Sequence, residues 1–166
     1  MCCEPLIEYG PKALEDHRKG LCTYDVEQVV LAIVVTTGIA SIFLTKDYTP
    51  DYNSGLAHAI FYAMTVYPVI EEKHLHGEVV GFGVLIALLA DQQYDEFEKI
   101  YRLNKAVHLP VSLDEIEITK EEWEECMERI PDMSDVDHYP YRVTKEMLAD
   151  AMDKLKERVR RDNEEK

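Results

Sequence analysis

Two of the six histidines stand in sequence surroundings that favour a chemical role. His58 lies in the segment GLAHAIFYAM, whose small and apolar residues predict burial, and a buried imidazole needs a hydrogen-bond partner or a metal ion. His76 lies in HGEVVGFG, where Gly77 would let another group approach the backbone closely. Neutral imidazole nitrogens are suitable ligands for Zn²⁺ and related divalent ions. These residues suggest a metal site, with core or capping histidines as the alternative.

The spacing of the histidines leaves two arrangements open. The 18 positions from His58 to His76 allow one helix to end and the chain to return, so both rings could face one point. The rival pair, His74 and His76, would point to the same side if that segment were extended. The sequence has no G-x-G-x-x-G, P-loop or G-x-S-x-G motif, and the carboxylates lie mainly on predicted solvent-facing surfaces, which favours no catalytic role for them.

Helices are expected to carry both histidines. Ser54 is predicted to cap a helix that includes His58 and ends before Pro68, and a mostly buried helix is predicted to start near Gly77. Alternating strand patterns are hard to find, so we expect an all-α fold, a helical bundle. Before Gly20 we expect helical structure with a break or kink at Gly10-Pro11. Longer helices are predicted from Thr23 to Leu44 and from Tyr94 to Val107. The last helices are predicted to start at the capping boxes Ser112/Glu115 and Thr119/Glu122 and after Thr144.

The most apolar segment runs from Val29 to Leu44 and has sixteen uncharged residues. This length falls short of the ~20 residues that cross a bilayer, and the segment begins too far into the chain for a secretory signal. We therefore expect a buried, central helix and not a membrane segment.

Composition limits the classes of function. The 166 residues suit a single domain, 1–166, and 46% hydrophobic and 31% charged residues with a mean hydropathy of −0.27 are typical of a globular protein. The net charge of −15 disfavours nucleic acid and anionic membrane surfaces as partners. Residues 91–137 contain fifteen acidic and five basic residues, which predicts a solvated face or a docking surface for a basic partner. Four cysteines without C-x-x-C spacing predict a reducing cytoplasm.

The segments around both histidines resemble a known family. The segments that carry the resemblance are, in order, LIEYGPKAL, the apolar helix with Thr37-Gly38, SGLAHAIFYAMTVYP, EEKHLHGEVVGFGVLIALL, VHLPVSLDEIEI and DHYPYRVTKEMLADAM. The chain resembles the carboxyl-terminal helical domain of glycerol dehydrogenases, which belong to the iron-containing alcohol dehydrogenase superfamily. The resemblance covers roughly residues 3–159. Nothing in the sequence corresponds to the amino-terminal nucleotide-binding domain of that family.

The resemblance implies a particular chemistry. In the family, the amino-terminal domain holds NAD and the helical domain holds a divalent metal, such as zinc, through one aspartate and two histidines. The resemblance places the histidine ligands at His58 and His76, where the metal would polarise a substrate alcohol while hydride passes to nicotinamide. The aspartate-bearing segment has no counterpart, Phe61 stands where the family often has another histidine, and Val79 replaces a frequent lysine after H-G-E.

Three functions follow as hypotheses. The chain could be one half of a metal- and NAD-dependent polyol or hydroxy-acid dehydrogenase that pairs with a separate amino-terminal dehydrogenase polypeptide and is inactive alone. It could instead be a catalytically silent, truncated module that forms a homo-oligomer or binds a partner, since the loss of neighbouring helices should expose apolar surface. A metal carrier built on the two histidines is the third hypothesis.

Overall fold

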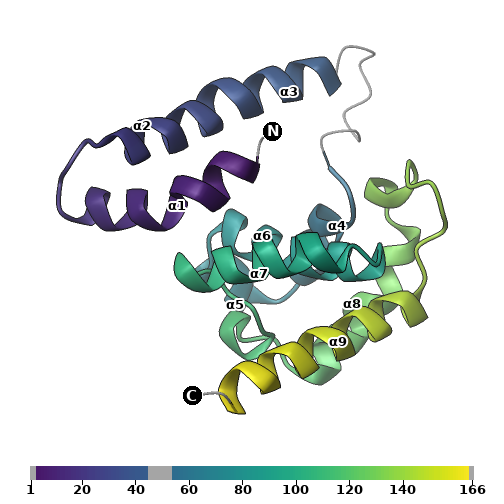
Figure 1. Cartoon of the computed structure of the whole chain (residues 1–166). Coiled ribbons are helices and arrows are strands. Elements are labelled where there is room, and N and C mark those ends of the chain that lie inside the picture. The colour runs from purple at the N-terminus through teal and green to yellow at the C-terminus, as the bar shows by residue number, and fades with distance from the viewer. Residues whose placement is uncertain (1–2, 45–53, 165–166) are drawn as a thin grey trace.

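The computed structural model describes residues 3–44 and 54–164, and across these two ranges the chain forms helices and no strands (Figure 1). The expected all-α class is confirmed. The α-helices are α1 (Cys3–Arg18), α2 (Tyr24–Leu31), α3 (Thr37–Leu44), α4 (Leu56–Met64), α5 (Pro68–Lys73), α6 (His76–Ala90), α7 (Tyr94–Ala106), α8 (Lys120–Arg129) and α9 (Lys145–Glu164). A π-helical turn at Ala32–Thr36 joins α2 to α3, and short 3-10 turns lie at Asp114–Ile116, Ile130–Asp132 and Ser134–Val136.

Helix α6 is the centre of the helical body. It contacts α4, α7 and α9, and it is apolar on all sides, as a helix surrounded by other helices must be (Figure 1). Phe82, Leu85 and Ile86 of α6 are completely buried. The ring of Phe82 meets Trp123 of α8 edge to face, with 6.4 Å between ring centroids. The core therefore lies between α4, α6, α8 and α9.

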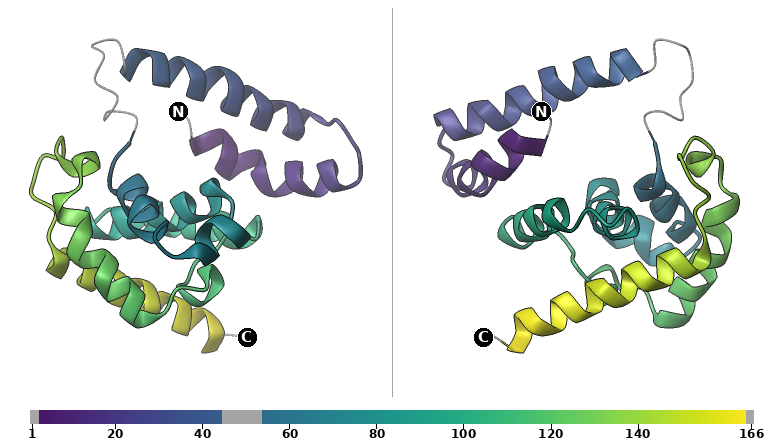
Figure 2. Two further views of the ribbon diagram at one scale, coloured as in Figure 1. Left: turned by 180° about the vertical axis from the view of Figure 1, so that it is seen from behind. Right: turned by 45° about the vertical axis from the view of Figure 1, so that its right-hand side comes forward.

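The amino-terminal helices form a hairpin beside this body. Helices α2 and α3 and the π turn between them form one long helix, and α1 runs alongside its first half. Both Figure 1 and Figure 2 show this hairpin next to the body, with α1 nearer to α7 than the long helix is. Helix α1 contacts α7, so α1 is the element that attaches the hairpin to the body.

The prediction of a buried central helix at 29–44 is wrong. Ala32 packs toward α1 and is 2% exposed, but Val34 is 66% and Ile42 71% exposed. Hydrophobicity predicts which surface a segment would bury, whereas burial also requires a neighbouring element to cover that surface. The helix has about the predicted extent, but the expectation that it is too short to span a bilayer changes, because the 20 residues Tyr24–Phe43 are long and apolar enough to cross a membrane by length and composition alone.

The helix breaks and N-caps predicted for the hairpin and for α4 agree with the structure only in part. Of the break or kink predicted at Gly10-Pro11, the break is wrong, because α1 continues through Pro11. Thr23 is the N-cap of α2 as predicted, but its hydroxyl donates to the buried carboxylate of Asp16 at 2.8 Å and caps no backbone N–H group of α2. The N-cap of α4 is Gly55, one residue later than the predicted Ser54.

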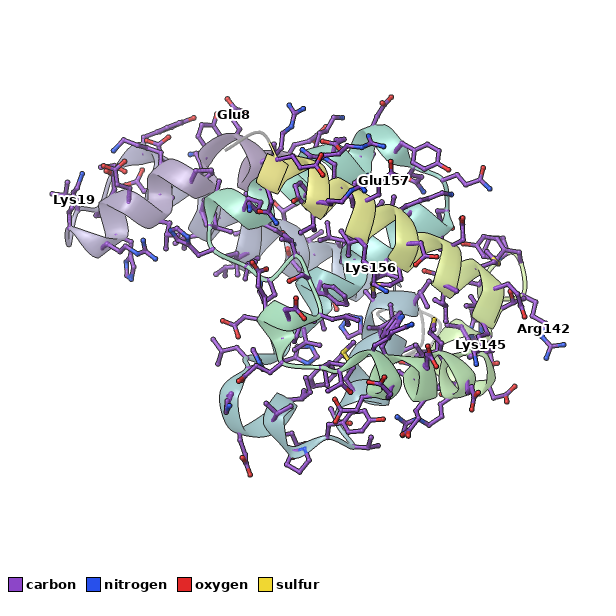
Figure 3. All side chains as sticks on the ribbon, turned by 90° about the horizontal axis from the view of Figure 1, so that it is seen from below. Glu8, Lys19, Arg142, Lys145, Lys156 and Glu157 are labelled. Carbon is purple, nitrogen blue, oxygen red and sulfur yellow. The ribbon has the colours of Figure 1, made fainter. Side chains whose placement is uncertain are left out.

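The carboxyl-terminal helices follow their sequence signals more closely. The capping box of Thr119 and Glu122 forms at the start of α8, and the hydroxyl of Thr144 accepts from the N–H of Met147 at the start of α9. The predicted apolar stripe of α9 is buried at Leu148, Ala151, Met152 and Leu155. Figure 3 shows labelled charged side chains pointing away from the ribbon, among them Glu8 of α1, Lys19 just after α1 and Glu157 of α9. Solvent-facing charge and a buried stripe together fix the orientation of α9.

Candidate metal centre

The close contact between α4 and α6 positions the candidate site. A Cβ atom at Gly83 would lie 2.7 Å from the carbonyl oxygen of Ala57, so the two helix backbones touch at this point. His58 follows Ala57 directly, in the first turn of α4. Gly83 is one of the closely spaced glycines Gly77, Gly81 and Gly83 of α6, and its lack of a side chain permits this close packing. The contact holds the start of α4 against α6.

The structure brings His58 and His76 together. Their ring centroids are 5.5 Å apart, with the ring planes inclined by 42°. His76 is the first residue of α6, and His58 lies near the start of α4. His74 lies elsewhere, with Nδ1 3.6 Å from a carboxylate oxygen of Glu78 and Nε2 3.7 Å from one of Glu117. The structure thus favours the His58 and His76 pair over the rival pair.

One side of the pair faces aromatic and apolar groups. The ring of Phe61 meets His76 edge to face, with 4.4 Å between centroids, and the ring of Tyr62 lies 6.5 Å from that of His58. Three exposed apolar residues belong to these helices or flank them, namely Tyr62 in α4, Val66 just after α4 and Leu75 just before α6. His58 is half-buried, less than the sequence predicted, and His76 is exposed. The pair is therefore accessible from outside the body.

Two sequence expectations near His76 change in the structure. Among residues 3–44 and 54–164, nothing lies within 4 Å of the Cβ position at Gly77, so no group of these ranges uses the close approach that this glycine permits. Val79 is completely buried in the core, so its apolar side chain does not alter the surface beside the imidazoles. The carboxylate of Glu78 accepts a hydrogen bond from the backbone N–H of Leu75 at 2.9 Å and so caps α6.

The electrostatic surroundings favour a neutral imidazole at His58. Burial lowers the pKa of His58 below its usual value of 6.5, and the neighbouring His76 lowers that pKa further. The charge of Asp135, in the turn Ser134–Val136, acts in the opposite direction. Sequence reasoning missed Asp135, because 77 positions separate it from His58 and no local pattern links them. A neutral imidazole keeps a nitrogen lone pair available for a metal ion.

The donor set on this chain fits a metal only in part. The imidazoles offer two nitrogen ligands, whereas a catalytic zinc site usually has three protein ligands and an open position. Within residues 3–44 and 54–164, no group of three or more histidine, cysteine, aspartate or glutamate side chains could hold a metal ion. Metal ligation by His58 and His76 stays a prediction, and a complete site would need a further ligand.

Comparison with known proteins identifies the relatives of this fold. No family model matches the chain. Glycerol dehydrogenase 1 of Schizosaccharomyces pombe is 30% identical over 120 residues, and glycerol dehydrogenase of Thermotoga maritima is 33% identical over 120 residues, each match covering 70% of this chain. This chain is a homologue of the glycerol dehydrogenases. It spans 24% and 30% of the length of these two relatives, which is consistent with a partial, carboxyl-terminal domain.

Solved structures agree on the fold. The chain superimposes on a probable glycerol dehydrogenase from Sinorhizobium meliloti with a TM-score of 0.77 and 24% identity, over 96% of this chain and 44% of the other. The glycerol dehydrogenase from Schizosaccharomyces pombe also gives a TM-score of 0.77 and 24% identity, over 99% of this chain and 41% of the other. Nearly the whole chain, hairpin included, thus follows the glycerol dehydrogenase fold.

Proposed function

We propose that this chain is the helical half of a metal- and NAD-dependent polyol or hydroxy-acid dehydrogenase. The observation that carries the proposal is the adjacency of His58 and His76, whose ring centroids lie 5.5 Å apart on an accessible side of a glycerol dehydrogenase fold. A separate amino-terminal dehydrogenase polypeptide would supply the NAD site and the missing carboxylate ligand. We propose that the 166 residues show no dehydrogenase activity without that polypeptide.

The residues of this chain would have distinct tasks in such a complex. His58 and His76 would hold a divalent metal, zinc or a related ion, which polarises the substrate alcohol when bound. The lowered pKa of His58 keeps its imidazole neutral and able to bind metal below the usual histidine range. Phe61 would hold the ring of His76 in place through their edge-to-face contact, with 4.4 Å between centroids. Hydride transfer needs the nicotinamide that the other half would bind.

The relatives narrow the class of substrate. Glycerol dehydrogenases dominate the similar proteins, and hydroxycarboxylate dehydrogenase A of Escherichia coli is 30% identical over 113 residues. Phe61 makes the wall beside His76 apolar. We therefore propose a small alcohol with an apolar group next to the reacting hydroxyl, within the polyol and hydroxy-acid classes.

A complementation experiment tests the proposal. The chain is mixed with the amino-terminal part of the Thermotoga maritima glycerol dehydrogenase, NAD, ZnCl₂ and a panel of diols and hydroxy acids, and NADH is followed by absorbance. We expect NADH from the mixture, none from either part alone, and none with His58→Ala. His17→Ala, which changes an exposed histidine of α1, is the matched control and should retain activity. A stable complex that makes no NADH would contradict the proposal.

A silent module that associates with itself or with a partner is the second candidate. The exposed apolar helix at Tyr24–Phe43 favours it, since such surface promotes association. The metal-carrier hypothesis predicts tight zinc binding without a partner, and equal zinc affinity of the native chain and His58→Ala would rule it out.

We also propose that the protein is located in a reducing cytoplasm, because Cys3 and Cys22 are exposed free thiols.

A further inference from the structure

The long helix of the hairpin carries an ordered apolar surface. Leu31, Val35, Ile39 and Phe43 follow one another at a four-residue spacing. In an ordinary α-helix such a row drifts around the axis, because one turn takes 3.6 residues. The π turn at Ala32–Thr36 adds a residue to the turn and offsets this drift. The four side chains therefore form one row along the helix.

A second row completes the surface. Val30, Val34 and Ile42 lie beside the first row, and we call the seven residues of both rows the apolar face. Each of the seven is between 45% and 71% exposed. The sequence has no charged residue from Gln28 to Leu44. Helix α1 packs along α2 and the π turn, and Val30 borders a pocket that α1 also lines, so the apolar face begins beside α1 and continues along α3, beyond the α1 contacts.

The area of the apolar face exceeds what a monomer normally exposes. From the exposed fractions, the seven side chains present on the order of 700 Å² of surface, against roughly 300–600 Å² for the largest patch on a typical monomer. A stable interface buries about 800 Å² on each partner. The apolar face alone thus nearly reaches the size that one side of a stable dimer requires.

Charge favours a second copy of the chain at this face. Two chains with a net charge of −15 repel each other over most of their surfaces. Residues 91–137 carry fifteen acidic residues, and this range includes α7, which contacts α1, as well as α8 on the far side of the body from the long helix (Figures 1 and 2). The uncharged apolar face is where two copies meet with the least repulsion. A position across a bilayer suits the long helix less, because Lys12, Glu15 and Asp16 of α1, which packs along α2, would enter the hydrocarbon with it.

We propose that the apolar face binds the same face of a second copy, forming a two-fold symmetric dimer with the long helices antiparallel. In this arrangement Leu31 packs against Phe43 of the other copy and Val35 against Ile39, because the row reads similarly in both directions. A two-fold contact closes on itself and leaves no further apolar face to extend the assembly. This proposal does not depend on a dehydrogenase function, since His58 and His76 lie on α4 and α6.

Sedimentation equilibrium of the full chain over a concentration series tests the dimer. We expect a reversible monomer–dimer equilibrium for the native chain. Val34→Glu places two carboxylates in the interface, one from each copy, and should weaken dimerisation by about 100-fold or more. Val66→Glu is the matched control, because Val66 is also an exposed valine, at 56%, and lies on another surface. It should dimerise like the native chain. Circular dichroism verifies that both variants are folded, and Ile42→Glu repeats the test at the other end of the face.

Each other result overturns the proposal. A native chain that stays monomeric at all concentrations, or a dimer that survives both Val34→Glu and Ile42→Glu, would show that the apolar face does not pair with itself. Growth beyond the dimer would exclude the closed two-fold contact. Co-sedimentation of the native chain, but not Val34→Glu, with neutral phosphatidylcholine vesicles would identify a bilayer as the occupant. A dimer with no activity in the complementation experiment would contradict only the proposed function.

Discussion

The chemistry of the candidate site depends on how far His58 is removed from water. Half-burial lowers its pKa, so the folded chain resists protonation of this imidazole while the unfolded chain accepts a proton near pH 6.5. The unfolded state therefore binds more protons in the window below pH 6.5. The contribution of His58 to folding stability must fall as the pH is lowered through that window.

A pH series of unfolding measures this effect. We expect the free energy of unfolding to decrease between pH 7.5 and pH 5.5, and to decrease less in His58→Gln, which keeps a polar side chain but cannot titrate. Urea denaturation at both pH values gives the two differences, with His17→Gln as control because His17 is exposed. The same decrease in the native chain and in His58→Gln would contradict a perturbed His58.

Cys126 is buried where its chemistry is suppressed. Its thiol donates to the carbonyl oxygen of Ala63 at 3.4 Å, and burial raises its pKa to about 11 from 9.0. At pH 8 the thiolate fraction should be about 100-fold below that of an ordinary cysteine, and the thiolate is the nucleophile. Alkylation with iodoacetamide followed by mass spectrometry should label the exposed Cys22 quickly and Cys126 only after denaturation. Rapid labelling of Cys126 in the folded chain would disprove this burial.

At the scale of elements, the packing of α4 on α6 decides the geometry of the histidine pair. The two helices meet at Gly83, where the Ala57 backbone leaves no space for a methyl group. Any side chain there forces the helices apart and changes the relative positions of His58 and His76. The site therefore depends on a residue that carries no functional group.

Two alanine substitutions in α6 should have opposite effects. Gly83→Ala should destabilise the fold by about 1–3 kcal/mol, because the added methyl overlaps backbone. Gly77→Ala has nothing within 4 Å and should be neutral or stabilise by up to about 1 kcal/mol, since alanine favours the helix. Thermal and urea unfolding of the two variants give the comparison. Equal stabilities would show that α4 and α6 do not touch as described.

Local signals predicted several elements and misjudged others for identifiable reasons. The capping box at Thr119 and Glu122 involves residues three positions apart, so the sequence contains the whole interaction. The side chain of Thr23 was also a plausible cap, but Asp16, seven positions away on another helix, takes its hydroxyl hydrogen bond. A break at Pro11 was expected, yet α1 passes through that residue. The error at Thr23 arises because a partner outside the local segment competes for its hydroxyl group.

At the scale of the whole molecule, the hairpin and the body should differ in stability. The long helix is supported mainly by α1, and α1 contacts the body through α7, whereas α6 is packed by three other helices. Segments with few buried contacts open at lower free energy than the core. The chain should therefore consist of a stable body with a hairpin that opens more easily.

Hydrogen exchange followed by mass spectrometry tests this difference. In Val34→Glu, amides of residues 24–43 should exchange faster than those of residues 79–89, by a factor of ten or more, which is about 1.4 kcal/mol or more. In the native chain at concentrations that favour the dimer, we expect protection of 24–43 to rise. Protection of 24–43 equal to that of 79–89 in the variant would show that the hairpin is as stable as the body.

The sequence by itself determined the helical class, the positions of most helices, the family resemblance and the two histidines, because these rest on short-range periodicity, caps and local motifs. Tertiary structure decided which histidines meet, since the approach of His58 to His76 requires α4 to pack against Gly83 of α6. It also decided that the apolar segment from Val29 to Leu44 is exposed. Hydropathy records how strongly a segment avoids water, but only the arrangement of the other helices determines whether anything covers it.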